Sequence, residues 1–142
     1  MTGIIIAGHG NFASGMYSVI KLVAGEQENL EVVDFLEGDS TEDLKEKMIK
    51  ELDKINEEEC LFFTDIPGGS PFKTAVEISM EREGCEVISG SNVPMIMEIL
   101  FDRDGSNIEE LKERAMETGK NQIKSFELRK NRDKKENIDE GI

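Results

Sequence analysis

A single histidine, His9, stands between two glycines in the stretch Gly8-His9-Gly10-Asn11. The glycines leave the imidazole unshielded and allow the backbone to turn sharply. The stretch lies between an apolar run and a helical pattern, which predicts a loop at the carboxyl end of a strand, where open α/β sheets bind ligands. The positive N-terminus of the next helix attracts phosphate. Gly8, His9 and Gly10 are therefore candidates for a nucleophilic site, although a lone histidine can also be purely structural.

An acidic side chain stands at a second junction of the same kind. The stretch after another apolar run is Thr64-Asp65-Ile66-Pro67-Gly68-Gly69-Ser70-Pro71-Phe72. Gly68 and Gly69 expose backbone N–H groups, and Ser70 offers a hydroxyl and is expected to cap the next helix. A capped turn does not explain Asp65 at the exit of an apolar strand. A carboxylate that accepts one imidazole N–H fixes the tautomer, so we expect Nδ1–H of His9 to face Asp65 and Nε2 to attack.

A third stretch of this kind follows a fourth apolar run and is Gly90-Ser91-Asn92-Val93-Pro94-Met95. Ser91 or Asn92 can bond locally as a turn cap, and Asn92 is also a candidate for the lining of the site. One histidine and two separated cysteines make a poor zinc site. The glycine patterns of ATP and dinucleotide sites are absent as well. We therefore expect no metal and no cofactor, and phosphoryl donors and acceptors that are other proteins.

The elements that must position these residues follow from the apolar pattern. Five apolar runs predict strands at Gly3–Ala7, Leu30–Phe35, Cys60–Thr64, Glu86–Ser89 and Ile123–Leu128. The first and third runs are continuously apolar, which is typical of a sheet covered on both faces. Helical patterns lie between and after them. They are Phe12–Ala24, a helix opening at Ser40-Thr41-Glu42-Asp43, Pro71 to about Arg82, Pro94 to about Phe101, and Ile108–Gln122.

The alternation of strands and helices predicts an α/β fold. We expect a doubly wound, mostly parallel sheet of order 2-1-3-4 with helices on both faces. The last run is expected to be a C-terminal edge strand that can run antiparallel. In this order the first and third strands are neighbours whose following helices lie on opposite faces, which makes a topological switch point. His9 and Asp65 would then face each other across the crevice.

Composition limits the other possibilities. The chain of 142 residues has a formal net charge of −14, and an acidic surface disfavours nucleic-acid binding. We expect one domain over residues 1–128 and a charged polar tail over 129–142. Cys60 and Cys85 are expected to be small core residues of a reduced protein. No apolar stretch approaches the roughly 20 residues of a membrane span, and no signal peptide is apparent, so a cytoplasmic location is expected.

Three motifs in order resemble the mannose-type enzyme IIA of the bacterial sugar phosphotransferase system. They are Ile5-Ile6-Ala7-Gly8-His9-Gly10, Asp65-Ile66-Pro67-Gly68-Gly69-Ser70-Pro71-Phe72 and Gly90-Ser91-Asn92-Val93-Pro94-Met95. The resemblance covers about residues 1–128. It implies that His9 carries a phosphoryl group, with Asp65 beside it and Gly68, Gly69 and Ser70 lining the site. Lys73 stands where the family commonly has asparagine, which would add a positive charge near the phosphate or alter docking.

The resemblance also implies partners. Phosphate would come from the phosphohistidine of HPr, at the expense of phosphoenolpyruvate, and pass to a histidine of enzyme IIB. The membrane components IIC and IID would be involved only indirectly. Such domains are typically homodimers in which the last strand, here Ile123–Leu128, joins the sheet of the partner subunit.

Three other functions remain compatible with the sequence. They are the phosphocarrier subunit of a dihydroxyacetone kinase system, a regulatory domain that phosphorylation switches, and a binding module with a structural histidine. The Gly-Gly-Ser-Pro-Phe stretch favours the sugar transporter over the first. The absence of a DNA-binding or ATPase domain in the sequence argues against the second. The third predicts no phosphoryl transfer from HPr.

Overall fold

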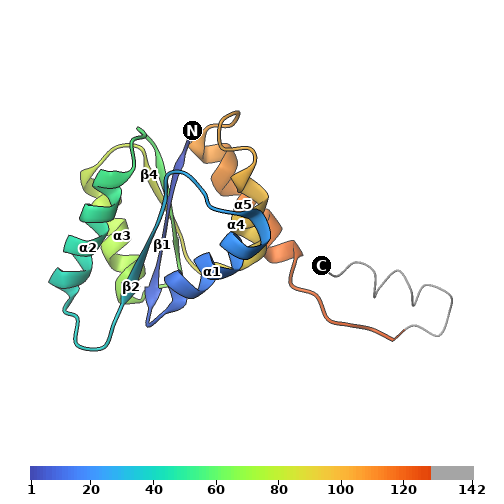
Figure 1. Ribbon diagram of the computed structural model, residues 1–142, viewed down its shortest axis with the longest axis horizontal. Helices are drawn as coiled ribbons and strands as arrows, with labels where there is room; N and C mark the ends of the chain where they lie inside the picture. The colour runs from blue at the N-terminus through green and yellow to red at the C-terminus, as the bar shows by residue number, and fades with distance from the viewer. Residues whose placement is uncertain (129–142) are drawn as a thin grey trace.

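The protein was analysed as a computed structural model, which describes residues 1–128 (Figure 1). Strands and helices alternate along these residues up to β4, after which two helices follow one another. The elements are β1 (Gly3–His9), α1 (Phe12–Ala24), β2 (Leu30–Phe35), α2 (Thr41–Lys54), β3 (Cys60–Thr64), α3 (Ser70–Glu81), β4 (Cys85–Ile88), α4 (Val93–Leu100) and α5 (Ile108–Asn121). The predicted tail at 129–142 lies outside the described residues.

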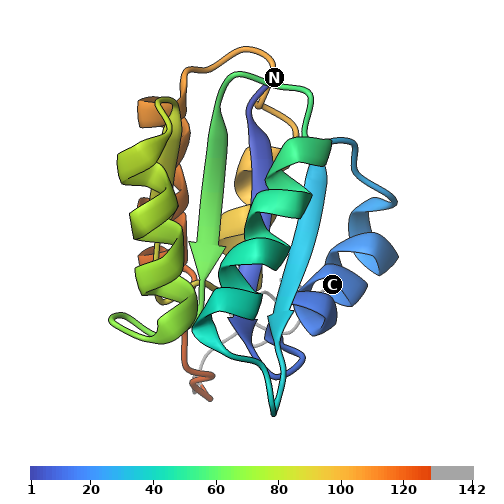
Figure 2. The same cartoon turned by 90° about the vertical axis from the view of Figure 1, so that its left-hand side faces the viewer.

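The four strands form one parallel sheet of order β2-β1-β3-β4, as the sequence predicts. Figure 2 shows β2, β1 and β3 side by side, with α2 and α3 on the face of the sheet nearer the viewer. The central strand β1 pairs with both neighbours, Ile5 lying opposite Glu31 of β2 and opposite Phe62 of β3. β1 and β3, which carry His9 and Asp65 at their ends, are thus adjacent.

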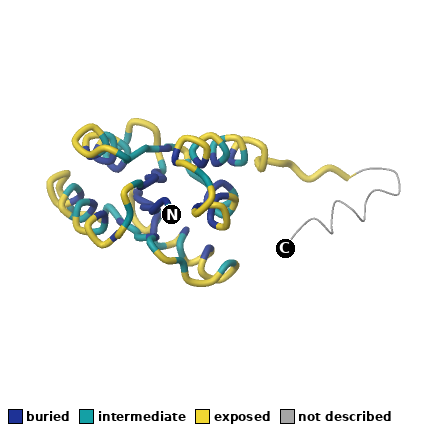
Figure 3. The backbone as a smooth tube through the Cα atoms, turned by 90° about the horizontal axis from the view of Figure 1, so that it is seen from above, coloured by how far each residue is buried: buried dark blue, intermediate teal, exposed yellow. Residues whose placement is uncertain are grey.

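Helices cover both faces of the sheet, with α1, α4 and α5 on one side and α2 and α3 on the other (Figures 1 and 3). Ile4 and Ile6 of β1 pack in the first of the two cores, whereas Ile5 and Ala7 pack in the second. Successive side chains of a strand point to opposite faces. A strand covered on both sides must therefore be continuously apolar, which is the pattern that the sequence shows.

β1 is longer than predicted. It continues through Gly8 and His9, because these two residues pair with Asp34 and Phe35 of β2. His9 is therefore the last residue of a strand and not a loop residue. A side chain at the end of a central strand is held by neighbours on both sides, so its position is better defined than that of a residue in a loop.

The predicted fifth strand is not formed. Residues Ile123–Leu128 follow α5 as an exposed segment without strand pairing in the described chain (Figure 1). Phe126 in this segment is 67% exposed. A strand needs the hydrogen-bonding edge of another strand, and a single copy of the described chain does not bring this apolar segment to one.

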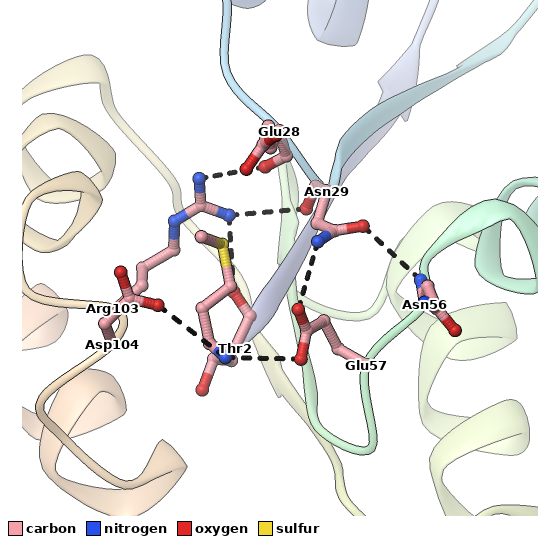
Figure 4. A network of polar contacts seen from close by, with 8 residues as sticks. Thr2, Glu28, Asn29, Asn56, Glu57, Arg103 and Asp104 are labelled. Atoms are coloured by element: carbon pink, nitrogen blue, oxygen red, sulfur yellow. Dashed lines mark hydrogen bonds and ion pairs between the residues drawn. The ribbon is translucent and has the colours of Figure 1, made fainter.

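The end of the sheet opposite His9 is held by a buried guanidinium. Arg103, only 4% exposed, donates to the carbonyl oxygens of Glu28 (2.9 Å), Thr2 (3.3 Å) and Asn29 (3.4 Å) (Figure 4). Burial lowers the pKa of Arg103, but its ordinary pKa is so high that the group stays charged. One side chain thus joins the start of β1, the α1–β2 loop and the α4–α5 loop.

We expect Gly84→Ala to lower the free energy of unfolding by more than about 2 kcal/mol. Gly84 has φ +82°, a conformation that L-residues rarely adopt, and an added Cβ would overlap the carbonyl oxygen of Glu58. Urea unfolding of both variants would measure the loss. Gly105→Ala is the matched control, because an added Cβ there meets nothing within 4 Å. Equal midpoints for the two variants would contradict the steric argument.

Candidate active site

The structure brings His9 and Asp65 together at the carboxyl ends of β1 and β3. Nδ1 of the imidazole lies 2.8 Å from Oδ2 of Asp65, and the backbone N–H of His9 donates to the same oxygen at 2.8 Å. A proton on Nδ1 therefore makes a charge-assisted hydrogen bond. Nε2 makes no hydrogen bond to any residue from 1 to 128. In the tautomer that carries the proton on Nδ1, Nε2 is the nitrogen with a free lone pair.

Exposure separates the roles of the two side chains. The His9 side chain is 43% exposed, whereas that of Asp65 is 11% exposed. The ring of Phe35, at the end of β2, packs against the imidazole edge-on with ring centroids 5.8 Å apart. The imidazole is thus held on one side by a carboxylate and on another by an aromatic ring, and it offers its remaining nitrogen to an incoming partner.

Asp65 stays ionised in this setting. Burial by itself raises the pKa of Asp65, but hydrogen bonds from the backbone N–H and imidazole of His9, together with a smaller effect of the nearby backbone of Ile66, outweigh it and lower the pKa below its ordinary value. Its contribution to the free energy of unfolding is therefore complete above the unfolded value of about 3.9 and is lost as the pH falls through the lowered pKa. At neutral pH the site holds a full negative charge behind the imidazole.

The second carboxylate oxygen of Asp65, Oδ1, differs from Oδ2 in its surroundings. Oδ1 is buried and has no hydrogen-bond partner among residues 1–128, and the same holds for Oγ of Ser91. Backbone bonds place Ser91 beside the β3 exit, because its N–H donates to the carbonyl oxygen of Thr64, and that of Gly90 donates to the carbonyl oxygen of Asp65. The third predicted stretch therefore lies next to Asp65, and backbone hydrogen bonds hold it there.

The predicted glycines have different roles in the structure. Gly8 packs against Phe12 so closely that a Cβ would overlap that ring. Gly10 (φ +57°) and Gly68 (φ +78°) make the turns that leave β1 and approach α3. Gly69 lies nearest the imidazole, since a Cβ there would come within 2.9 Å of Cε1 of His9. Cε1 lies between the two ring nitrogens, so the start of α3 faces the reactive side of the ring.

We expect Gly69→Ala to slow phosphoryl acceptance on the order of 10- to 100-fold, because misplacing a reacting group by a fraction of an ångström to an ångström has effects of this size. The φ of Gly69 is −73°, so alanine brings no backbone strain; its Cβ would overlap Cε1 of His9 and come within 3.3 Å of the carbonyl oxygen of Ile66. Rapid-quench measurement of the transfer rate would test this. Gly15→Ala, where an added Cβ meets nothing within 4 Å, should transfer at the wild-type rate.

Ser70 does not cap a helix as predicted, whereas Asn92 caps one, which is one of the two roles expected for it. Ser70 is the first residue of α3 and makes no capping bond; the N-cap is Gly69, so the predicted cap is wrong by one residue. The Asn92 amide caps α4, accepting from the N–H of Met95 at 3.2 Å, and donates to the carbonyl of Gly119 at 3.0 Å. Both ends of that amide are thus used to tie α4 to α5, while the Ser70 hydroxyl makes no hydrogen bond to residues 1–128.

Sequence reasoning missed a second acidic residue at the same edge of the sheet. Asp34, at the end of β2, accepts the backbone N–H of Ser14 at 3.0 Å and its hydroxyl at 2.6 Å. A carboxylate therefore already occupies the N-terminus of α1, the helix end that the sequence analysis offered to phosphate. The signal was present, since Asp34 leaves an apolar strand as Asp65 does. The start of α3 is consequently the better place for a phosphoryl group.

His9 lies at the exposed carboxyl edge of the sheet. A polar cavity of about 800 Å³ lies at the other end of the strands, around Arg103, Glu57 and Asp104, remote from His9. Within residues 1–128, no cluster of three His, Cys, Asp or Glu side chains could hold a metal ion. No helix in this part of the chain is both long and apolar enough to cross a membrane. An exposed imidazole at the edge of a sheet is accessible to a macromolecular partner.

Together, the fold and the site define a doubly wound α/β domain with an accessible, carboxylate-backed histidine at its switch point. The family model described as EIIA-man, PTS system fructose IIA component, matches residues 3–116. The chain belongs to this family, the mannose-type enzyme IIA components of the sugar phosphotransferase system. This confirms the family and the function class that the three sequence motifs predict.

Individual relatives agree with this assignment. The mannose-specific EIIAB component of Escherichia coli is 38% identical over 89% of this chain, although the chain spans only 40% of that protein. The fructose-specific EIIA component of Bacillus subtilis is 34% identical over 78% of this chain and 77% of its own. The crystal structure of an EIIA component from Streptococcus agalactiae matches with a TM-score of 0.82 and 32% identity, covering 89% of this chain and 98% of that one.

Proposed function

We propose that His9 accepts a phosphoryl group from the phosphohistidine of HPr and passes it to a histidine of enzyme IIB. The observation that carries this proposal is the orientation of the imidazole, with Nδ1 on Asp65 and Nε2 exposed. The Nε2 lone pair attacks phosphorus, and the P–N bond to HPr breaks, its electrons returning to the imidazole of HPr. The same two events in the opposite sense transfer the group to IIB.

Asp65 stabilises the charge that forms in this step. As Nε2 bonds to phosphorus, the ring becomes positively charged, and a carboxylate 2.8 Å from Nδ1 balances that charge without moving. Gly69 at the start of α3 lies beside Cε1 of the ring. We expect the N-terminus of this helix, with Gly68, Gly69 and the Ser70 hydroxyl, to attract the phosphoryl oxygens. Gly10 makes the turn after His9, and Gly8 lets the ring of Phe12 pack against the end of β1.

The direct test is phosphorylation of the purified full chain. The protein is mixed with enzyme I, HPr and phosphoenolpyruvate, and its intact mass is measured at neutral pH. We expect a gain of one phosphoryl group, which is lost in acid and survives alkali, as for a phosphoramidate. Absence of any gain while HPr itself is phosphorylated would overturn the proposed function. A gain that survives acid would place the group on a hydroxyl and not on His9.

The acceptor and the location follow from the same proposal. A carrier between HPr and IIB works in the cytoplasm, at the membrane components IIC and IID. The relatives described above are sugar-specific IIA or IIAB components, which favours this role over the dihydroxyacetone, regulatory and structural alternatives. The sequence departure Lys73 lies in α3 and is exposed, where it is accessible to a docking partner.

We also propose that the protein is a homodimer that uses its exposed C-terminal segment. Ile123, Phe126 and Leu128 are all more than two thirds exposed, which is costly for an apolar segment in water. In the described residues β4 pairs on one side only, with β3, so its other edge can accept a strand. Val19, Met97 and Phe101 line an apolar groove of about 510 Å³ beside the end of α5.

We expect Phe126→Asp to convert the dimer to a monomer, because a charge cannot be buried in that contact without a partner. Sedimentation velocity over a range of concentrations would show the change. Lys124→Asp in the same segment alters charge without removing apolar surface and should leave the dimer intact. A wild-type protein that is monomeric at every concentration would refute the dimer. A dimer that survives Phe126→Asp would place the interface elsewhere.

A further inference from the structure

The two cysteines of the chain lie directly opposite each other on neighbouring strands. Cys60 begins β3 and Cys85 begins β4, and the parallel register pairs them. Strands that pair in a sheet are about 4.7–4.9 Å apart, and a disulfide spans Cα separations of about 4.4–6.8 Å. The sequence predicts that Cys60 and Cys85 are small core residues, and the fold places the two thiols in one row of the sheet.

Both thiols are also on the same face. Cys60 belongs to the core between the sheet and the helices α2 and α3, and Cys85 packs against that core. Residues paired in a parallel ladder project their side chains to the same side, so no rotation of a strand is needed to bring the sulfurs together. Each of these observations is independent of the site at His9, which lies at the other end of the strands.

Access differs between the two sulfurs. A small cavity of about 210 Å³ borders both cysteines and Arg82. Cys60 is 2% exposed, whereas Cys85 is only partly buried. Burial raises the pKa of both thiols, but the charge of Arg82 partly offsets this at Cys85. The thiolate is the reactive form, so Cys85 reacts first with an oxidant that enters the cavity.

We propose that Cys60 and Cys85 form a reversible intramolecular disulfide when the protein meets a peroxide. The Cys85 thiolate attacks one oxygen of hydrogen peroxide, the O–O bond breaks, and Cys85 becomes a sulfenic acid with release of hydroxide, which takes up the thiol proton as water. The Cys60 sulfur then attacks the Cys85 sulfur, and the S–O bond breaks with loss of a second water. A thiol reductant restores both thiols by exchange.

The test uses the reduced full chain and intact mass spectrometry. The protein is treated with hydrogen peroxide, unfolded in N-ethylmaleimide, and weighed. We expect the mass to fall by about 2 Da with no maleimide added, against two maleimides on untreated protein. Dithiothreitol should restore both adducts. The rate should rise with pH across the neutral to alkaline range, because thiolate supply limits it.

Single-cysteine variants distinguish the order of steps. Cys60→Ala should stop at a Cys85 sulfenic acid, which dimedone traps, whereas Cys85→Ala should keep an unoxidised Cys60 over the same time. Wild-type protein that retains two alkylatable thiols would overturn the proposal. So would disulfide-linked dimers on a non-reducing gel in place of the internal bond. Phosphoryl acceptance at His9 is a separate measurement, so failure of either proposal leaves the other testable.

Discussion

His9→Ala is expected to abolish phosphoryl acceptance completely while leaving the fold intact. His9 is the only histidine in the chain, so no neighbouring imidazole can substitute for it. The side chain is 43% exposed and packs mainly against Phe35. Its removal should therefore change the free energy of unfolding by no more than about 1 kcal/mol. The backbone N–H of residue 9 still donates to Asp65, which keeps the carboxylate satisfied.

Intact mass after incubation with enzyme I, HPr and phosphoenolpyruvate measures the loss, and urea unfolding measures the stability. A phosphorylated His9→Ala variant would show that the group resides elsewhere. An unfolded variant would be uninformative about chemistry, so His9→Gln, which keeps a polar side chain of similar length, provides a second test of the same position. We expect it to be folded and equally inactive.

Asp65→Asn should slow phosphoryl transfer to His9 on the order of 10²- to 10³-fold. Asparagine keeps the shape of the side chain, and its oxygen can take the place of Oδ2, where it still accepts from the backbone N–H and from Nδ1 of His9. The amide carries no charge, however, so it does not balance the positive charge that the ring gains as Nε2 bonds to phosphorus. Removal of one preorganised group that stabilises developing charge commonly slows a reaction by about this factor. Rapid-quench kinetics with phosphorylated HPr would measure the rate.

Asp34→Asn is the matched control. Asp34 stands at the end of the neighbouring strand β2 and carries the same charge, but it binds Ser14 and not His9. A rate close to wild type for Asp34→Asn would show that position and not net charge matters. Equal losses in the two variants would indicate a general electrostatic effect. A wild-type rate for Asp65→Asn would remove the orienting role given to Asp65.

Much of the fold could be predicted because the sheet is covered on both faces. The runs Leu30–Phe35 and Cys60–Thr64 coincide with β2 and β3, since buried parallel strands leave a continuous apolar signal. The strand order followed from the alternation of elements, and with it the pairing of His9 and Asp65 across the switch point. These predictions succeed because the contacts concerned lie within one chain, and the burial of each strand or helix face determines where apolar residues recur in the sequence.

Other features depend on information that periodicity does not carry. Ile123–Leu128 has a strand-like composition, but whether it pairs depends on an edge that this copy of the chain does not supply. Val19 and Val23 share the apolar spacing of α1, yet they are 42% and 49% exposed, because the core takes only part of that stripe. The hydrogen bond between Ser14 and Asp34 joins residues 20 positions apart in the sequence. It can be inferred only when the packing of β2 beside α1 is known.

One oxygen of Asp65 grips His9 at two points, the backbone N–H and Nδ1. This is a chelate, in the sense that coordination chemistry gives the word. If the imidazole rotates, the bond from Nδ1 to Oδ2 breaks, while the backbone N–H of His9 still holds that oxygen in place. The backbone of His9 can move away from Asp65 only if the ends of β1 and β3 separate. The orientation of the His9 imidazole, and with it the proposed phosphoryl acceptance, therefore depends on the pairing of β1 with β3. Loss of phosphoryl acceptance on heating or in urea should coincide with cooperative unfolding and should not precede it.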